Sequence, residues 1–217
     1  NNAFGILYGT LLAVGCELIP MPNVLAQTHN DSSNLEKIYS IDNSPDESKY
    51  PTKVVKKIFF SSVKIIGPVE GSGVLINKTG RTYTVLTAWH ILKDSGDSEE
   101  IAILTPDMMK HNAINFSKFR IGASDMAIIK FNSSLDYQIA SKSDPEFVRG
   151  MKIFVAGYPR DVQGSITFDT GEIVQSTINY INEGNPNYFM DQGYHLMYTN
   201  ETVAGMSGGG IYSIDGH

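Results

Sequence analysis

Gly205-Met206-Ser207-Gly208-Gly209-Gly210 places one serine among four glycines near the C-terminal end of the sequence. Apolar, strand-like residues follow at Ile211, Tyr212 and Ile214. Glycine has no Cβ, so it tolerates positive φ and lets a substrate approach the backbone closely. A tight turn of this kind can direct successive N–H groups at one point, as a developing oxyanion requires. Alone, the pattern also describes a flexible surface loop, so its interpretation depends on two further motifs.

These two motifs contain a histidine and an aspartate beside strand-like runs. Thr87-Ala88-Trp89-His90-Ile91 ends one apolar run, and Ser124-Asp125-Met126-Ala127-Ile128-Ile129 begins another. A nucleophilic serine needs a base within hydrogen-bond reach, and that base needs an acceptor that determines its tautomer. The order along the chain is His90, Asp125 and then Ser207, which is the order of the triad in chymotrypsin-like proteins.

Each residue also has an ordinary structural interpretation. Without the neighbouring motifs, His90 would be a core or loop histidine. Asp125 would be a turn aspartate at the start of a strand. Other aspartates are rivals by residue type: Asp94, Asp97 and Asp107. The apolar run directly behind Asp125 favours it over these rivals.

Together, the three motifs resemble a trypsin-like (chymotrypsin-fold) serine peptidase of the bacterial type, over roughly residues 53 to 217. The resemblance implies that Ser207 attacks the scissile carbonyl and that His90 acts as the general base. It further implies that Asp125 accepts from the His90 ring and that the backbone N–H groups of Gly205 and Ser207 form the oxyanion hole. This chemistry requires no cofactor and no metal.

The sequence departs from the family pattern close to Ser207. Met206 stands where animal members carry an aspartate that pairs with a freshly cut N-terminus, so we expect no activation by that device. Gly210 stands where a proline is common. Glu201, six residues before Ser207, matches the base of the primary specificity pocket. It could pair there with a Lys or Arg side chain of the substrate, although an exposed loop glutamate is the alternative.

Short β-branched runs separated by turn signals predict an all-β fold. We expect one long or two short strands over 54–55, 58–60 and 63–66, a hairpin over 71–87, and a turn at 169–171 between two further strands. The pattern alone does not distinguish a sandwich from a barrel. The resemblance implies two six-stranded-type antiparallel β-barrels, chymotrypsin-like, with the site in the cleft between them. Because the chain ends ten residues after Ser207, we expect the second barrel to be truncated at the C-terminus.

The predicted organisation has four parts. They are a signal peptide (1–26), a linker or pro-segment (27–52), an N-terminal β-barrel (53–135) and an incomplete C-terminal β-barrel (148–217). The leader is apolar from residue 4 to 19 apart from Glu17, is broken by Pro20 and Pro22, and ends in a small-x-small cleavage site at Ala26. A buried or interfacial N-terminal helix is the alternative. The apolar stretch is short for a membrane span, so we expect no stable membrane anchor.

The composition narrows the class of function. The net charge is −6 without a long basic run, which argues against nucleic-acid binding. Cys16 is the only cysteine and lies in the predicted leader, as suits a bacterial exported enzyme. We therefore predict a monomeric, secreted or periplasmic serine endopeptidase with a polypeptide substrate. The alternatives are a catalytically silent trypsin-like peptide-binding module, an inactive fragment, or an esterase of unrelated fold, for which the triad order is wrong.

Overall fold

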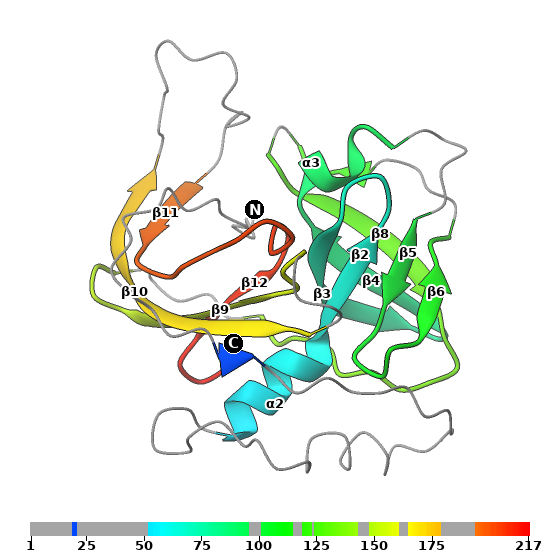
Figure 1. Cartoon of the computed structure of the whole chain (residues 1–217), viewed down its shortest axis with the longest axis horizontal. Coiled ribbons are helices and arrows are strands. Elements are labelled where there is room, and N and C mark those ends of the chain that lie inside the picture. The colour runs from blue at the N-terminus through cyan, green and yellow to red at the C-terminus, as the bar shows by residue number, and fades with distance from the viewer. Residues whose placement is uncertain are drawn as a thin grey trace.

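The computed structural model of the 217-residue chain describes residues 19–20, 52–95, 101–114, 119–122, 124–142, 148–160, 165–178 and 194–217. Most of the predicted signal peptide (1–26) and of the linker or pro-segment (27–52) lies outside these residues. The chain forms two curled antiparallel sheets that contact each other through β2, β3 and β9 (Figure 1). The predicted mostly-β fold of two antiparallel units is confirmed.

The first sheet has seven strands in the order β6-β5-β2-β3-β4-β8-β7. They are β2 (Ser62–Ile66), β3 (Gly71–Thr79), β4 (Thr82–Thr87), β5 (Ala102–Leu104), β6 (Lys110–Asn112), β7 (Phe119–Arg120) and β8 (Ala127–Asn132). The predicted hairpin is confirmed as β3–β4. Directly after β6, Ala113 bridges to Phe131 of β8, so the sheet curls round on itself. Such closure pairs strand edges that would otherwise be open.

The interior of this sheet holds one apolar cluster with fully buried side chains. Its largest fully buried members are Tyr83, Phe131, Ile65, Leu75, Leu92 and Ile103. The rings of Tyr83 and Phe131 stack with centroids 5.2 Å apart. Along β8, buried residues alternate with more exposed ones from Ala127 to Asn132, which is the period of a strand with one buried face.

The second sheet has five strands, with β1-β10-β9-β12 in order and β11 paired to β10. They are β1 (Ile19–Pro20), β9 (Lys152–Gly157), β10 (Thr167–Ile178), β11 (Tyr194–Tyr198) and β12 (Gly210–Ser213). The expected turn at 169–171 is wrong, because β10 runs through it as one strand, which pairs with β9 as far as Glu172 and with β11 from Ile173 onward. A Cβ on Gly171 would overlap the side chains of Thr199 and Asn200, so this glycine permits close packing instead of a turn.

Residues 52–61 form helix α2 (Thr52–Ser61), so the strands expected at 54–55 and 58–60 are wrong. Val54, Val55, Ile58 and Phe59 are buried, and this spacing is the helical one. They pack against residues of the second sheet and its loops: Phe154, Tyr158, Ile166, Phe168 and Tyr212. The β-branched and aromatic residues favoured a strand, but burial against this sheet outweighs that preference.

The two sheets are joined at the turn before β12. The Ser72 N–H, at the start of β3, donates to the Ser207 carbonyl at 2.8 Å. Gly208 has φ +84°, and a Cβ there would overlap the Ser72 carbonyl oxygen and the Thr87 hydroxyl. The turn can therefore lie against β3 and β4 only because residue 208 has no side chain.

The Ile58→Ala substitution tests the contribution of α2. Ile58 is fully buried, so its truncation should lower the free energy of unfolding by about 2–5 kcal/mol through lost burial and a residual cavity. Chemical denaturation measures this change. Lys53→Ala, on an exposed position of the same helix, is the control and should change the value by less than about 0.5 kcal/mol. Equal effects of the two substitutions would contradict the packing described for α2.

The Gly208→Ala substitution tests the junction between the sheets, and Gly80→Ala is its matched control. Both glycines have positive φ, but a Cβ on Gly80 would meet nothing within 4 Å. Gly80→Ala should therefore cost only the backbone strain, about 1–2 kcal/mol. Gly208→Ala should cost more and should also displace the Ser207 turn. Denaturation and the chemical shifts of 205–209 report these effects, and indistinguishable variants would refute the close contact.

Candidate active site

His90 lies on α3 (Trp89–Leu92), a single helical turn that begins where β4 ends. Asp125 accepts hydrogen bonds from two backbone N–H groups of this turn. The Trp89 N–H donates to the Asp125 carbonyl at 3.2 Å, and the His90 N–H donates to Asp125 Oδ1 at 2.8 Å. The first N–H groups of a helix lack intrahelical acceptors, so the aspartate supplies them.

The His90 ring contacts the same carboxylate. Nδ1 lies 2.7 Å from Asp125 Oδ2, and the two side chains are 18% and 17% exposed. An ionised carboxylate can only accept hydrogen bonds, so Nδ1 is the donor. In the neutral ring this leaves the lone pair on Nε2, and the imidazole is held in the tautomer that a general base requires.

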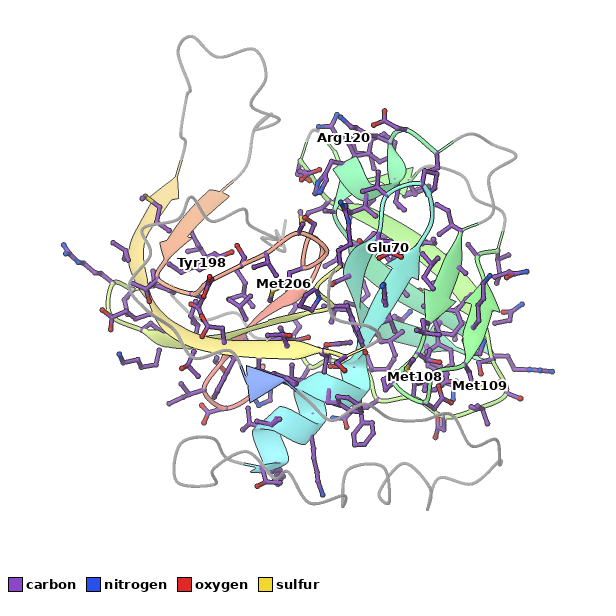
Figure 2. The ribbon with its side chains drawn as sticks, viewed as in Figure 1. Glu70, Met108, Met109, Arg120, Tyr198 and Met206 are labelled. Carbon is purple, nitrogen blue, oxygen red and sulfur yellow. The ribbon has the colours of Figure 1, made fainter. Side chains whose placement is uncertain are left out.

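Asp125 is positioned by the turn between β7 and β8. The Ile121 N–H donates to the Met126 carbonyl at 2.8 Å, and Arg120 Nε donates to the Ser124 carbonyl at 2.8 Å. The Arg120 guanidinium also lies 5.9 Å from the centroid of the Trp89 ring. Figure 2 shows Arg120 beside α3. Arg120 thus contacts both segments that meet at the His90–Asp125 pair, and sequence reasoning missed it because no motif contains it.

Ser207 is half-buried in the turn between β11 and β12. Its carbonyl accepts from the Ser72 N–H, and Gly208 lies against Thr87, three residues before His90. These contacts bring the Ser207 main chain to the end of β4, the strand that leads into α3. Gly209, two residues after Ser207, donates to the Met206 carbonyl at 2.9 Å.

The orientations of the peptide groups around Ser207 follow from the hydrogen bonds that their carbonyls accept. The Ala204 carbonyl accepts from the Arg160 N–H at 2.8 Å, and the Met206 carbonyl accepts from Gly209. Every described peptide bond is trans, so the N–H groups of Gly205 and Ser207 point opposite to these carbonyls. Within the described part of the chain, neither N–H donates to another backbone carbonyl. Both are therefore available to an external oxygen.

Glu201 is half-buried, and its backbone is held by a buried carboxylate. The Glu201 N–H donates to Asp169 Oδ2 at 2.7 Å, and the Asn200 side-chain amide donates to the Asp169 carbonyl at 2.9 Å. Asp169 lies on β10 and is only 2% exposed. Sequence reasoning assigned Asp169 to a turn and so missed this role.

The rival aspartates lie elsewhere or are not described. Asp107 accepts from the hydroxyl groups of Thr105 and Tyr137, on the loop that follows β5. Burial raises the pKa of Tyr137 to about 12, so its hydroxyl stays protonated as a donor at neutral pH. Asp94 is exposed beside Lys93. Asp97 lies outside the described residues.

Searches for other kinds of site cover only the part of the chain that the structure describes. There, no group of three or more His, Cys, Asp or Glu side chains is arranged to hold a metal ion. None of the helices in these ranges is long and apolar enough to cross a membrane.

Known proteins with this fold include two groups of solved structures. Rv3671c protease in an inactive form is 23% identical, with a TM-score of 0.59 over 81% of this chain and 82% of that chain. A serine-to-alanine mutant of Rv3671c from M. tuberculosis H37Rv is 21% identical, with a TM-score of 0.60 over 81% of this chain and 80% of that chain. Deg5 is 15% identical, with a TM-score of 0.63 over 81% of this chain and 85% of that chain.

No curated protein sequence matches the chain. The structural neighbours share its fold, which confirms the expected chymotrypsin-like architecture. The sequence profile described as trypsin-like peptidase domain matches residues 71–217, which include His90, Asp125 and Ser207. The chain belongs to the family of trypsin-like peptidase domains.

Proposed function

We propose that the chain is a serine endopeptidase that cleaves polypeptides through an acyl-enzyme. The two hydrogen bonds from His90 to the Asp125 carboxylate, at 2.7 and 2.8 Å, carry the proposal. They hold the imidazole in the tautomer of a base. The Ser207 turn, tied to the adjacent strands, supplies the nucleophile.

In this mechanism, Ser207 Oγ attacks the scissile carbonyl carbon while His90 Nε2 takes the hydroxyl proton. Asp125 stabilises the resulting imidazolium. The N–H groups of Gly205 and Ser207 donate to the tetrahedral oxyanion. Collapse breaks the C–N bond, and the leaving amine takes the proton from His90. Water, deprotonated by His90, then hydrolyses the acyl-enzyme and frees Ser207.

The proposal also covers the location, the oligomeric state and the substrate preference of the enzyme. The apolar leader before Ala26 supports export to the periplasm or the medium. We also propose that the enzyme acts as a monomer. Glu201, six residues before Ser207, would attract a Lys or Arg side chain at the cleaved residue.

Labelling with a fluorophosphonate probe tests the nucleophile. The probe should label the wild-type chain on Ser207 and should not label Ser207→Ala, because only an activated hydroxyl displaces fluoride. Ser213→Ala, on β12, is the matched control and should keep full labelling. A wild-type chain that binds peptides but is never labelled would instead be a silent binding module.

Asp125→Asn should lower kcat by about 10⁴-fold, since the amide would select the wrong histidine tautomer.

The Glu201→Gln substitution tests the specificity assignment. It should lower kcat/KM for substrates with Lys or Arg at the cleaved residue by about 10- to 100-fold, as expected for a lost charge-assisted hydrogen bond. Substrates with an apolar residue there should be much less affected. Glu172→Gln removes an exposed carboxylate paired with Lys152 and should leave this ratio unchanged. Equal ratios in both variants would show that the Glu201 carboxylate does not bind the substrate side chain.

A further inference from the structure

The hydroxyl, N–H and carbonyl of Ser72 all form hydrogen bonds with the segments that meet at the Ser207 turn. Ser72 is the second residue of β3 and is fully buried. Its hydroxyl donates to the Gly205 carbonyl at 2.8 Å and accepts from the Tyr158 N–H at 2.8 Å. Its N–H donates to Ser207, and its carbonyl accepts from Thr87 Oγ1 at 2.7 Å. A serine hydroxyl has a single proton, so these contacts determine its direction.

The turn that Ser72 contacts has little conformational preference of its own. Gly205 has φ +97°, and glycine populates many backbone conformations about equally. The next side chain, Met206, carries no charge and is 5% exposed, packed against the second sheet (Figure 2). No ion pair can therefore be made from that side chain to fix the turn. Hydrogen bonds to its backbone therefore orient the peptide groups of this turn.

Each of these hydrogen bonds orients a different peptide group. Arg160 holds the 204–205 peptide, and Gly209 holds the 206–207 peptide. The peptide between them, 205–206, has its carbonyl held by the Ser72 hydroxyl. It links the two N–H groups proposed for the oxyanion hole, so its orientation sets how those groups lie relative to each other. The Met206 N–H of the same peptide donates to Val203 at 3.1 Å.

We infer that Ser72 is a positioning residue for the oxyanion hole, with its hydroxyl locking the 205–206 peptide so that the Gly205 and Ser207 N–H groups converge on one oxygen. The inference rests on the proposed function. Ser72 does not touch the reacting atoms in this role. It fixes the turn from the first sheet, whereas Ser207 belongs to the segment that enters the second. The hydrogen bond from the Ser72 hydroxyl therefore also holds Ser207 in position relative to His90.

The test compares Ser72→Ala with Ser62→Ala. Both remove the hydroxyl of a buried β-strand serine that donates to a backbone carbonyl, but Ser62 donates to Ile58 at the end of α2. With p-nitrophenyl acetate and labelled casein as substrates, Ser72→Ala should lower kcat by about 10- to 100-fold, as misplaced catalytic groups do. KM should change by less than about threefold. Ser62→Ala should keep the kcat of the wild-type chain.

Amide hydrogen exchange supplies a readout that does not depend on turnover. Ser72→Ala should speed exchange at Met206 and Gly209 by about 10-fold or more, with β4 unchanged, because only the turn loses its tether. Ser62→Ala should leave these two amides protected. If Ser72→Ala does not fold, Ser72→Cys is measured instead, since a thiol of similar shape is only a weak donor.

The outcomes separate the two proposals. A wild-type chain that hydrolyses neither substrate faster than Ser207→Ala overturns the proposed function, and the catalytic role of Ser72 falls with it. An active wild-type chain in which Ser72→Ala keeps kcat and amide protection overturns the role of Ser72 alone. A lowered kcat with faster exchange in the turn, absent from Ser62→Ala, supports the inference.

Discussion

The hydrogen bond from the Ser72 N–H to the Ser207 carbonyl joins the two sheets at the candidate site. His90 and Asp125 lie at the end of the first sheet, on α3 and in the turn before β8, whereas Ser207 precedes the last strand of the second. The geometry of the site therefore depends on the register between the sheets. Gly208 secures that register because its missing side chain lets the turn touch β3 and β4 directly. A misplacement of catalytic groups by about 1 Å can lower the rate of a reaction about 100-fold, so this small contact has a large effect on the geometry that catalysis needs.

Within the first sheet, Asp125 performs two tasks with one carboxylate. Oδ1 accepts the His90 N–H and so holds the helical turn, while Oδ2 accepts from the ring and holds the tautomer. The two bonds restrict the histidine at both its backbone and its side chain. Arg120 contacts both segments that carry the pair, by donating to the Ser124 carbonyl and by lying over the Trp89 ring. The pair is thus built before any substrate binds, as preorganised electrostatic catalysis requires.

Elements that depend on local interactions were predicted correctly, whereas elements that depend on distant contacts were not. The β3–β4 hairpin was predictable because its turn residues and alternating pattern act locally. Helix α2 was not, since Val54, Val55, Ile58 and Phe59 favour strands by type and become helical only against the second sheet. The turn expected at 169–171 failed for a related reason. Gly171 there makes room for Asn200 and Thr199, which lie far along the chain. Asp169 and Ser72 escaped notice because their partners are also distant, whereas Arg120 was missed because no motif contains it.

The sequence by itself determined the mostly-β class, the candidate histidine, aspartate and serine, and their order, because motifs and strand periods are short-range properties of the chain. Only the tertiary structure decided that His90 donates twice to Asp125 and that Asp169 holds Glu201. It alone showed that Ser72 reaches across to the Gly205 turn. These contacts join residues from separate strands, and hydrogen bonds act only over about 3 Å. They exist once packing of the two sheets has brought those strands together, which no local pattern encodes.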